Sequence, residues 1–274
     1  MALPRARSRA HVPSQTLTGQ VALEFRLDRA GTHGIAPLLA LPPEERLDPL
    51  ARLVSAAPGS TAAALWLLLS LRQAGRLDAP PPGESPIPPR LLWTGPRGSE
   101  ALRAAWAAAE PGLAVTEFAT PREAAAFLAA RHGEAGAAAW RRADDDEVRA
   151  DLLRICWLAE GGGWAPAGDA LPVAPLSSLC AGGAGFVAGQ GPWGAPVRTL
   201  VGAAPGNPVI ARAAADLVAA LARGDREIPW LRCGPGFLAR ALAAAIAAEG
   251  PERAGVFLLP EHRLHRVVAG NCAL

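Results

Sequence analysis

A carboxylate and a guanidinium share one face of a strongly apolar helical stretch. Asp151 and Arg154 lie three residues apart in RADLLRICWLAEGGG, a spacing that places both side chains on the same side of a helix. The remaining positions are mostly apolar, which indicates a largely buried helix. A charged pair on such a helix needs a partner or a ligand. We consider a pair that binds hydroxyl groups and anionic oxygens, and, as the alternative, an ordinary intrahelical ion pair at the surface.

The next segment, residues 161–169 (GGGWAPAGD), combines three glycines with a single carboxylate. Two interpretations are open. The segment is either a plain connection from a helix to a strand, or the remainder of a site that binds a metal and a phosphate.

Other polar clusters have simpler explanations. The acidic run 144–147 (DDDE) stands where a helix is expected to begin, and acids favour a helix N-terminus through capping and the helix dipole. We interpret it as a helix start rather than a metal cluster. His132 precedes Gly133 and is expected to end a helix. His262 and His265 lie in a polar segment near the end of the chain, where surface positions are expected.

Composition excludes several classes of function. A formal net charge of +2 over 274 residues gives no electrostatic case for nucleic-acid binding. The four cysteines lack C-x-x-C spacing, which predicts buried thiols of a cytosolic protein rather than a zinc site. The most apolar run, 62–71, is too short to span a membrane, so no transmembrane segment is expected. No G-x-S-x-G or Walker pattern occurs.

The elements that position these residues alternate between strands and helices. This alternation predicts an α/β sheet with layered helices, in which ligands bind outside the carboxyl ends of the strands. Strands are expected at 90–93, 113–118, 186–189, 197–202 and 256–259. Helices are expected at 49–56, 61–74, 99–109, 121–131, 145–160, 208–223 and 236–248.

Capping residues define several helix ends. We expect Asp48 and Ser60 to cap the two helices near the N-terminus, Asn207 to cap the helix at 208–223, and Gly224 to stop it. A proline-rich linker at 79–86 separates these first helices from the rest. We therefore predict two parts: a helical extension with its linker over 1–84, and an α/β domain over 85–274.

Several segments of the second part, taken in order, resemble the nucleotide-sugar glycosyltransferases of family 32. They are IPPRLLWTGP, PGLAVTEFATPREAAAFLAARHG, RADLLRICWLAEGGGW with GDALPVAPL, GNPVIARAAADLVAAL and CGPGFLARAL. The resemblance implies a GT-A fold with a Rossmann-like sheet. It also implies transfer of a hexose, with retention of configuration, from a UDP- or GDP-sugar to a hydroxyl of a glycan, lipid or protein.

The resemblance assigns roles to particular residues. Trp93 matches the tryptophan that stacks on the nucleotide base, with a core aromatic as the alternative. Asp151 and Arg154 match the S-D-x-x-R pair that binds the donor sugar, although alanine replaces the serine here. Gly162 and Gly163 match a glycine turn that lets the backbone approach the donor, with an ordinary helix C-cap as the alternative.

The metal motif of the family is incomplete in this chain. The family's D-x-D falls on 167–169, where Asp169 is the one carboxylate, or on 166–168 if one residue is skipped. The resemblance implies Mn²⁺ or Mg²⁺ as cofactor, with His265 or Asn271 of the C-terminal segment as a further ligand.

Three functional hypotheses follow. The first is a glycosyltransferase that is cytoplasmic or membrane-peripheral. The second is a degenerate GT-A module that binds a nucleotide, a sugar or a protein without turnover, which the broken D-x-D favours. The third is an interaction protein that acts through its N-terminal helical hairpin.

Overall fold

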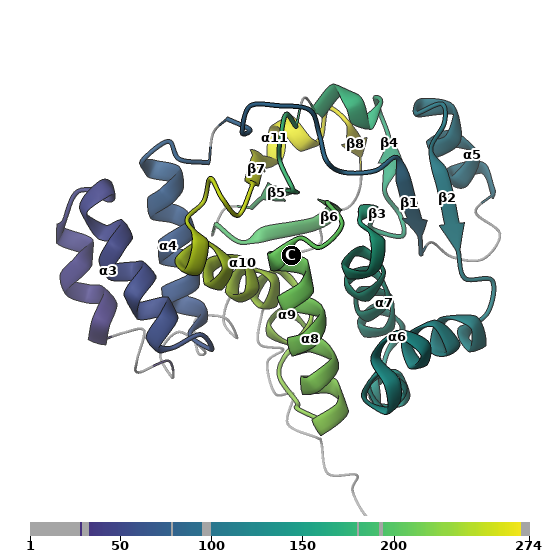
Figure 1. Ribbon diagram of the computed structural model, residues 1–274, viewed down its shortest axis with the longest axis horizontal. Coiled ribbons are helices and arrows are strands. Elements are labelled where there is room, and N and C mark those ends of the chain that lie inside the picture. Colours follow the sequence, from purple (N-terminus) through teal and green to yellow (C-terminus); the bar gives the residue numbers. More distant parts are fainter. Residues whose placement is uncertain are drawn as a thin grey trace, which may run out of the picture.

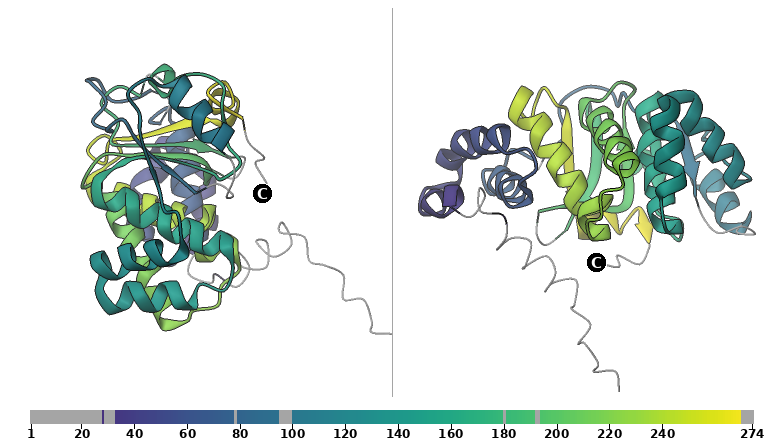
Figure 2. Two further views of the ribbon diagram at one scale, coloured as in Figure 1. Left: turned by 90° about the vertical axis from the view of Figure 1, so that its right-hand side faces the viewer. Right: turned by 90° about the horizontal axis from the view of Figure 1, so that it is seen from below.

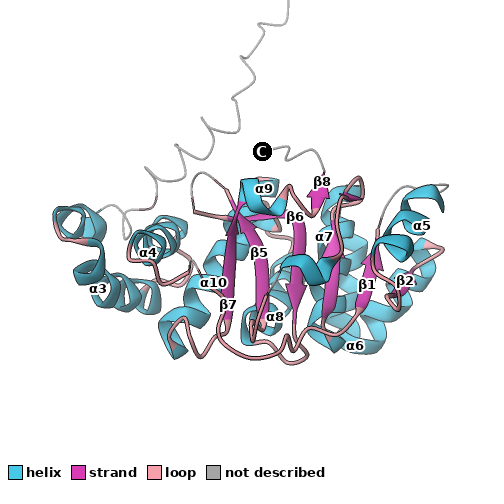
Figure 3. Ribbon diagram, turned by 90° about the horizontal axis from the view of Figure 1, so that it is seen from above, coloured by secondary structure: helices cyan, strands magenta, loops and turns pink. Residues whose placement is uncertain are grey.

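The structure is a computed structural model that describes residues 28, 33–77, 79–94, 100–179, 181–191 and 194–269. Its centre is a six-stranded sheet with the order β2-β1-β3-β6-β5-β7 (Figure 3). The strands of this sheet are β1 (Arg90–Trp93), β2 (Ala114–Glu117), β3 (Gly163–Pro166), β5 (Phe186–Gln190), β6 (Pro196–Ala203) and β7 (Val256–Pro260). β6 runs antiparallel to both of its neighbours, and the other pairings are parallel. β4 (Leu171–Pro172) and β8 (Val268–Ala269) form a separate antiparallel pair.

Helices cover both faces of the sheet (Figures 1 and 2). They are α3 (Pro43–Ala56), α4 (Thr61–Gln73), α5 (Glu100–Ala109), α6 (Pro121–Arg142), α7 (Asp146–Gly161), α8 (Pro208–Arg223), α9 (Pro229–Arg232), α10 (Pro235–Glu249) and α11 (Glu261–Leu264), with short 3-10 turns η1 (Ala36–Ala40) and η2 (Leu176–Leu179). In Figure 1, α6 to α10 lie below the sheet, and α5, α11 and the β4–β8 pair lie above it.

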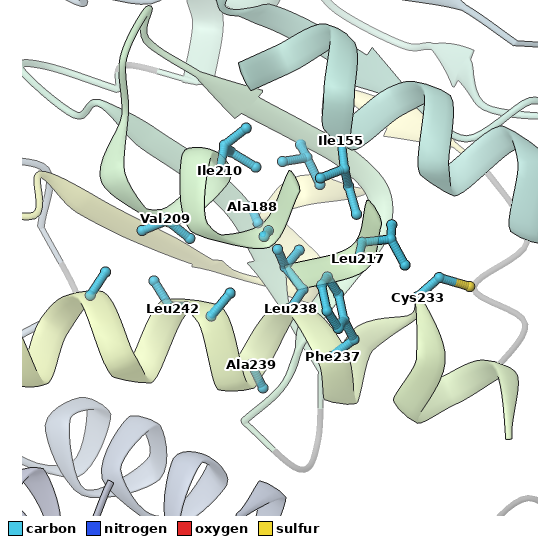
Figure 4. Close-up of a cluster of buried hydrophobic side chains, with 14 of the residues drawn as sticks. Ile155, Ala188, Val209, Ile210, Leu217, Cys233, Phe237, Leu238, Ala239 and Leu242 are labelled. Atoms are coloured by element: carbon cyan, nitrogen blue, oxygen red, sulfur yellow. The ribbon is translucent and has the colours of Figure 1, made fainter. Parts of the chain in front are cut away.

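Each face of the sheet has its own hydrophobic cluster, because side chains alternate along a strand. In β1, Leu92 belongs to the cluster under α7, α8 and α10, whereas Leu91 and Trp93 belong to the cluster on the opposite face. Figure 4 shows part of the first cluster, where Leu217 of α8 and Leu238 of α10 lie close to Ile155 of α7. The α/β prediction is confirmed, and a mostly parallel sheet between helices is consistent with a GT-A fold.

Most predicted elements are confirmed, and every strand expected from the sequence is present within one residue of its predicted ends. Ser60, Asp145 and Asn207 accept backbone N–H bonds as N-caps, and Gly224 adopts a left-handed conformation at the end of α8. The interpretation of the acidic run as a helix start is therefore confirmed at Asp145.

Two predicted helices were too short. α3 begins at Pro43 rather than after Asp48, because Pro43 suits the first helical position and two glutamates follow it; Pro49 lies inside the helix. The helix expected to end near His132 does break at Gly133, which has φ 59° and ψ −147°, but a second helical segment continues to Arg142. The chain direction changes at this glycine.

The N-terminal helices share the main core. Leu50 of α3 and Leu68 of α4 belong to the same hydrophobic cluster as Leu238 of α10. Polar contacts join the same regions, since Arg72 Nη1 donates to Gln190 Oε1 at 2.9 Å and Arg240 Nη1 donates to Thr61 Oγ1 at 3.2 Å. The described part of the extension therefore packs as one further layer of helix beside α10 (Figure 1).

One described stretch, Pro229–Glu249, is long and apolar enough to cross a membrane by length and composition, but 72% of its 18-residue apolar window is buried inside the protein. It comprises two helices, α9 and α10, and most of α10 packs in the main hydrophobic cluster. Two cysteines are buried, Cys156 in α7 and Cys233 between α9 and α10, and burial raises the pKa of the Cys156 thiol to about 12. Cys180 and Cys272 lie outside the described residues.

Because α4 is part of the main core, damage to it should destabilise the whole chain. Leu68→Ala removes a side chain with no exposed surface and should lower the free energy of unfolding by about 2–5 kcal/mol. Urea unfolding followed by circular dichroism should still show one transition. Leu39→Ala, at a residue that is 36% exposed, should change the free energy of unfolding by less than about 1 kcal/mol. A separate early transition in Leu68→Ala, with the main transition unmoved, would contradict a shared core.

Candidate functional site

The carboxyl ends of β1 and β3 and the amino end of β6 lie at one edge of the sheet. β6 enters from this edge because it is antiparallel to β3, and Pro166 at the end of β3 pairs with Leu200. Arg198 therefore lies just beyond the end of β3. The pairing is extended by a bond from Ala167 N to Thr199 O at 2.9 Å. In open α/β sheets, ligands bind at such a carboxyl edge.

Asp151 is shared by two guanidinium groups beneath this edge. Arg154 Nη1 donates to Asp151 Oδ1 at 3.1 Å, and Arg198 Nη1 donates to Asp151 Oδ2 at 2.8 Å. The side chains of Asp151 and Arg154 are only 6% and 8% exposed. The alternative of a surface ion pair is therefore wrong, and the pair belongs to a buried charge network.

Arg154 also binds the main chain of the sheet. Its Nη2 donates to Ala165 O of β3 at 2.8 Å and to Arg198 O of β6 at 2.6 Å. Burial lowers the pKa of Arg154, and Asp151 opposes this shift. The guanidinium thus joins α7 to both strands at the point where they pair.

Arg198 connects the network to solvent, with 27% of its side chain exposed. It also forms an ion pair with Glu147 in the first turn of α7. Burial alone would lower the pKa of Arg198, but Asp151 and Glu147 together raise it above its ordinary value. Arg198 was not among the residues singled out from the sequence, and Glu147 was considered only as part of the acidic run at the helix start. The available signal was an arginine within an otherwise apolar strand, PVRTLVGA.

Gly162 and Gly163 lie at the opposite end of β3 from Asp169. Gly162 ends α7 with φ 65°, which agrees with the C-cap alternative, and a Cβ there would lie 2.6 Å from Ala203 O. A Cβ on Gly163, which has φ 121°, would lie 2.7 Å from Arg90 O. The close approaches that require these glycines are therefore to protein backbone. Residues 161–169 do connect a helix to a strand, which is β3, and the interpretation as the remainder of a metal and phosphate site stays a prediction that rests on Asp169.

Trp93 ends β1 at the same edge but is only 3% exposed, within the upper hydrophobic cluster. This burial agrees with the core-aromatic alternative, and stacking on a base stays a prediction. The next residue is Thr94, whose Oγ1 is buried without a hydrogen-bond partner among the described residues. Residues 95–99, which follow, lie outside the described part of the chain.

Asp169 is exposed in the turn that follows β3. Ala170 N donates to Ala167 O at 3.0 Å, and Ala170 O accepts from Trp106 Nε1 of α5 at 3.1 Å, so the turn is anchored. The C-terminal segment returns beside it, since Leu171 of β4 pairs with Ala269 of β8.

His265 is exposed in the turn before β8, and Asn271 lies outside the described residues. Among the residues that the structure describes, no group of three or more histidine, cysteine, aspartate or glutamate side chains is arranged to hold a metal ion. A single carboxylate fits a cation that is shared with the phosphates of a ligand, since Mg²⁺ keeps several waters and often takes one or two carboxylates. It does not fit a metal held by protein ligands alone.

Comparisons with known proteins leave the family open. No protein-family model matches the chain, and no curated protein matches it. Five chains among the solved structures match. One of them, named "PaToxG Glycosyltransferase", is 15% identical with a TM-score of 0.39, and the match covers 75% of this chain and 92% of that one. A likeness this distant assigns neither a family nor a function.

Filling the space beside Gly163 should destabilise the protein strongly. Gly163→Ala combines an unfavourable φ, which costs roughly 1–3 kcal/mol, with overlap against Arg90 O and the Trp157 ring. Gly112→Ala is the matched control, because Gly112 has φ 89° and no atom within 4 Å of an added Cβ. Chemical denaturation should show Gly163→Ala to be less stable than Gly112→Ala by at least about 1 kcal/mol. Equal losses of stability in the two variants would show that an added Cβ at Gly163 is not crowded by its neighbours.

Removing the charge of Asp151 should leave two guanidiniums without their shared partner. Asp151→Asn should lower the free energy of unfolding by about 3–5 kcal/mol, as expected when one partner of a buried ion pair is lost. Asp216→Asn is the control, because it removes a carboxylate from an exposed i,i+4 ion pair with Arg212. It should lower the free energy of unfolding by less than about 1 kcal/mol. Similar stabilities for both variants, measured by denaturation at pH 7, would argue against a structural role for the network.

Proposed function

We propose that the chain binds a UDP- or GDP-hexose at the carboxyl edge of β1 and β3 and transfers the hexose to a hydroxyl of a glycan, lipid or protein. The observation that supports this most is the arrangement at the end of β3. There the buried Asp151–Arg154 pair, the half-buried Arg198 and the turn that carries Asp169 lie at one edge of an α/β sheet. Asp151 and Arg154 are the two residues that, in the sequence, resemble the pair that binds the donor sugar in family 32.

In this proposal Arg198 binds the diphosphate of the donor. Of the two arginines in the network it is the one that reaches solvent, and a guanidinium suits phosphate oxygens because it can donate two parallel hydrogen bonds. When Arg198 turns toward the phosphate, it uncovers Asp151 Oδ2. That oxygen can then accept a hydrogen bond from a sugar hydroxyl, while Arg154 stays on Oδ1.

Positive charge at the diphosphate would also favour departure of the nucleotide, because it stabilises the charge that develops on the leaving group. A divalent cation, Mn²⁺ or Mg²⁺, is proposed to arrive with the donor, with Asp169 as its ligand from the protein and His265 as a further candidate. We assign no catalytic base.

The second candidate function is binding of a nucleotide or sugar without turnover, in a cytoplasmic protein. The observation that favours it is that the 167–169 segment carries one carboxylate, Asp169, and that no group of three or more histidine, cysteine, aspartate or glutamate side chains in the described residues could hold a metal ion. The two functions share the donor site and differ only in turnover.

The test measures binding and turnover separately. The melting temperature is recorded with a panel of UDP- and GDP-hexoses, with and without Mn²⁺, and release of UDP or GDP is followed by chromatography. A ligand at a hundred times its dissociation constant should stabilise the folded state by about 2.7 kcal/mol, which raises the melting temperature by several degrees. Nucleotide release indicates the transferase, and a shift without release indicates the binding module.

Variants locate the site. Arg198→Gln should weaken donor binding at least tenfold, and Asp169→Ala should abolish the Mn²⁺-dependent part of binding and turnover. Asp216→Ala, at an exposed position on α8, serves as the control and should match the unaltered protein. If no nucleotide sugar changes the melting temperature in the presence of Mn²⁺, both functions are refuted.

A further inference from the structure

A cavity of about 480 Å³ lies on the upper face of the sheet, at the edge strand β7. Phe257 and Leu259 of β7 and Leu179 of η2 line it. Pro80, from the proline-rich segment, lines it as well. This segment is fixed in place, because Gly183 N donates to Pro81 O at 2.8 Å. The volume is within the range of small-molecule sites.

Two arginines, Arg263 and Arg266, line the same cavity. They belong to one turn after β7, since Arg266 N donates to Arg263 O at 3.2 Å. Both residues are exposed, and neither forms an ion pair or a side-chain hydrogen bond within the described part of the chain. No carboxylate is among the lining residues that the structure describes. The described lining therefore combines two positive charges with several apolar side chains.

This cavity is distinct from the Asp151, Arg154 and Arg198 part of the proposed donor site, although His265, the further candidate ligand for its cation, lies in the same turn as Arg263 and Arg266. The donor site lies at the end of β3, and β6 and β5 stand between β3 and β7. Three strand spacings amount to about 14 Å. The cavity also opens on the face of the sheet that carries η2 and α11, whereas Asp151 and Arg154 belong to α7 on the opposite face.

We propose that this cavity binds a phosphomonoester that carries an apolar group. A phosphomonoester has a charge of about −1.5 to −2 at pH 7, which matches two guanidiniums better than a single carboxylate does. The apolar group packs against Phe257, Leu259 and Leu179. The same chemistry occurs in a soluble phosphorylated metabolite and in the headgroup region of a lipid phosphate.

The test uses hexyl phosphate as the probe, with isothermal titration calorimetry on the full chain at low ionic strength and without nucleotide sugar. The unaltered protein should bind hexyl phosphate at least tenfold more tightly than inorganic phosphate, because the alkyl chain is buried. Arg263→Gln combined with Arg266→Gln should weaken binding of hexyl phosphate at least tenfold.

Arg122→Gln combined with Arg253→Gln is the matched control. Both residues are exposed, and neither lines the cavity, so the same change of charge should leave the affinity within twofold. Arg198→Gln should also leave it unchanged, which separates this site from the donor site. The proposal is overturned if the unaltered protein does not bind hexyl phosphate, or if any of these control variants loses it as fully as the cavity variant.

Vesicles of phosphatidylcholine with phosphatidic acid identify the source of the ligand. If the unaltered protein sediments with them and the Arg263/Arg266 variant does not, the cavity recognises a lipid phosphate. If hexyl phosphate binds and the vesicles do not, the cavity recognises a soluble phosphorylated molecule. Either result supports the cavity as the binding site.

Discussion

The carboxylate of Asp151 is the constraint on which the candidate site depends. It lies in the protein interior and balances two guanidiniums, one from its own helix and one from β6. A buried ion is costly unless it is paired and hydrogen-bonded. Here both carboxylate oxygens accept, and Arg154 also donates to the carbonyls of Ala165 and Arg198. The network thus fixes α7 relative to the antiparallel junction of β3 and β6, which is the place where the sheet changes direction.

The two ends of β3 differ in their surroundings: the amino end is closely packed, and the carboxyl end leads to polar groups. Its amino end is closely packed, since glycine is required to admit the backbone of β1 and the Trp157 ring. Its carboxyl end leads into an anchored turn with an exposed carboxylate, beside Arg198 and the returning C-terminal segment. The close packing at the amino end of β3 holds the strand in place, and the polar groups at its carboxyl end are positioned by that strand. Ligand sites of α/β sheets commonly lie at such carboxyl ends.

Much of the fold could be predicted because local signals and the tertiary structure agree. α8 begins and ends as predicted, since Asn207, Pro208 and Gly224 define its ends and an apolar stripe defines its buried face. β3 was not predicted, because a four-residue strand that begins with glycine and ends with proline lacks strand propensity and owes its conformation to pairing on both sides. Arg198 was missed for a related reason: its role arises from a contact 47 residues away in sequence, which no local pattern encodes.

Charge balance explains why Arg198, rather than Arg154, is suited to bind an anionic ligand. If Arg154 left Asp151, two main-chain carbonyls would lose their donor and a buried guanidinium would need a new partner. If Arg198 leaves, the Asp151–Arg154 pair remains neutral and buried, and Glu147 is exposed enough to be hydrated. Among these residues, Arg198 can therefore exchange a protein carboxylate for an external anion without leaving an unpaired charge in the core. A network built in this way can hold the fold together and still release one cation to a ligand.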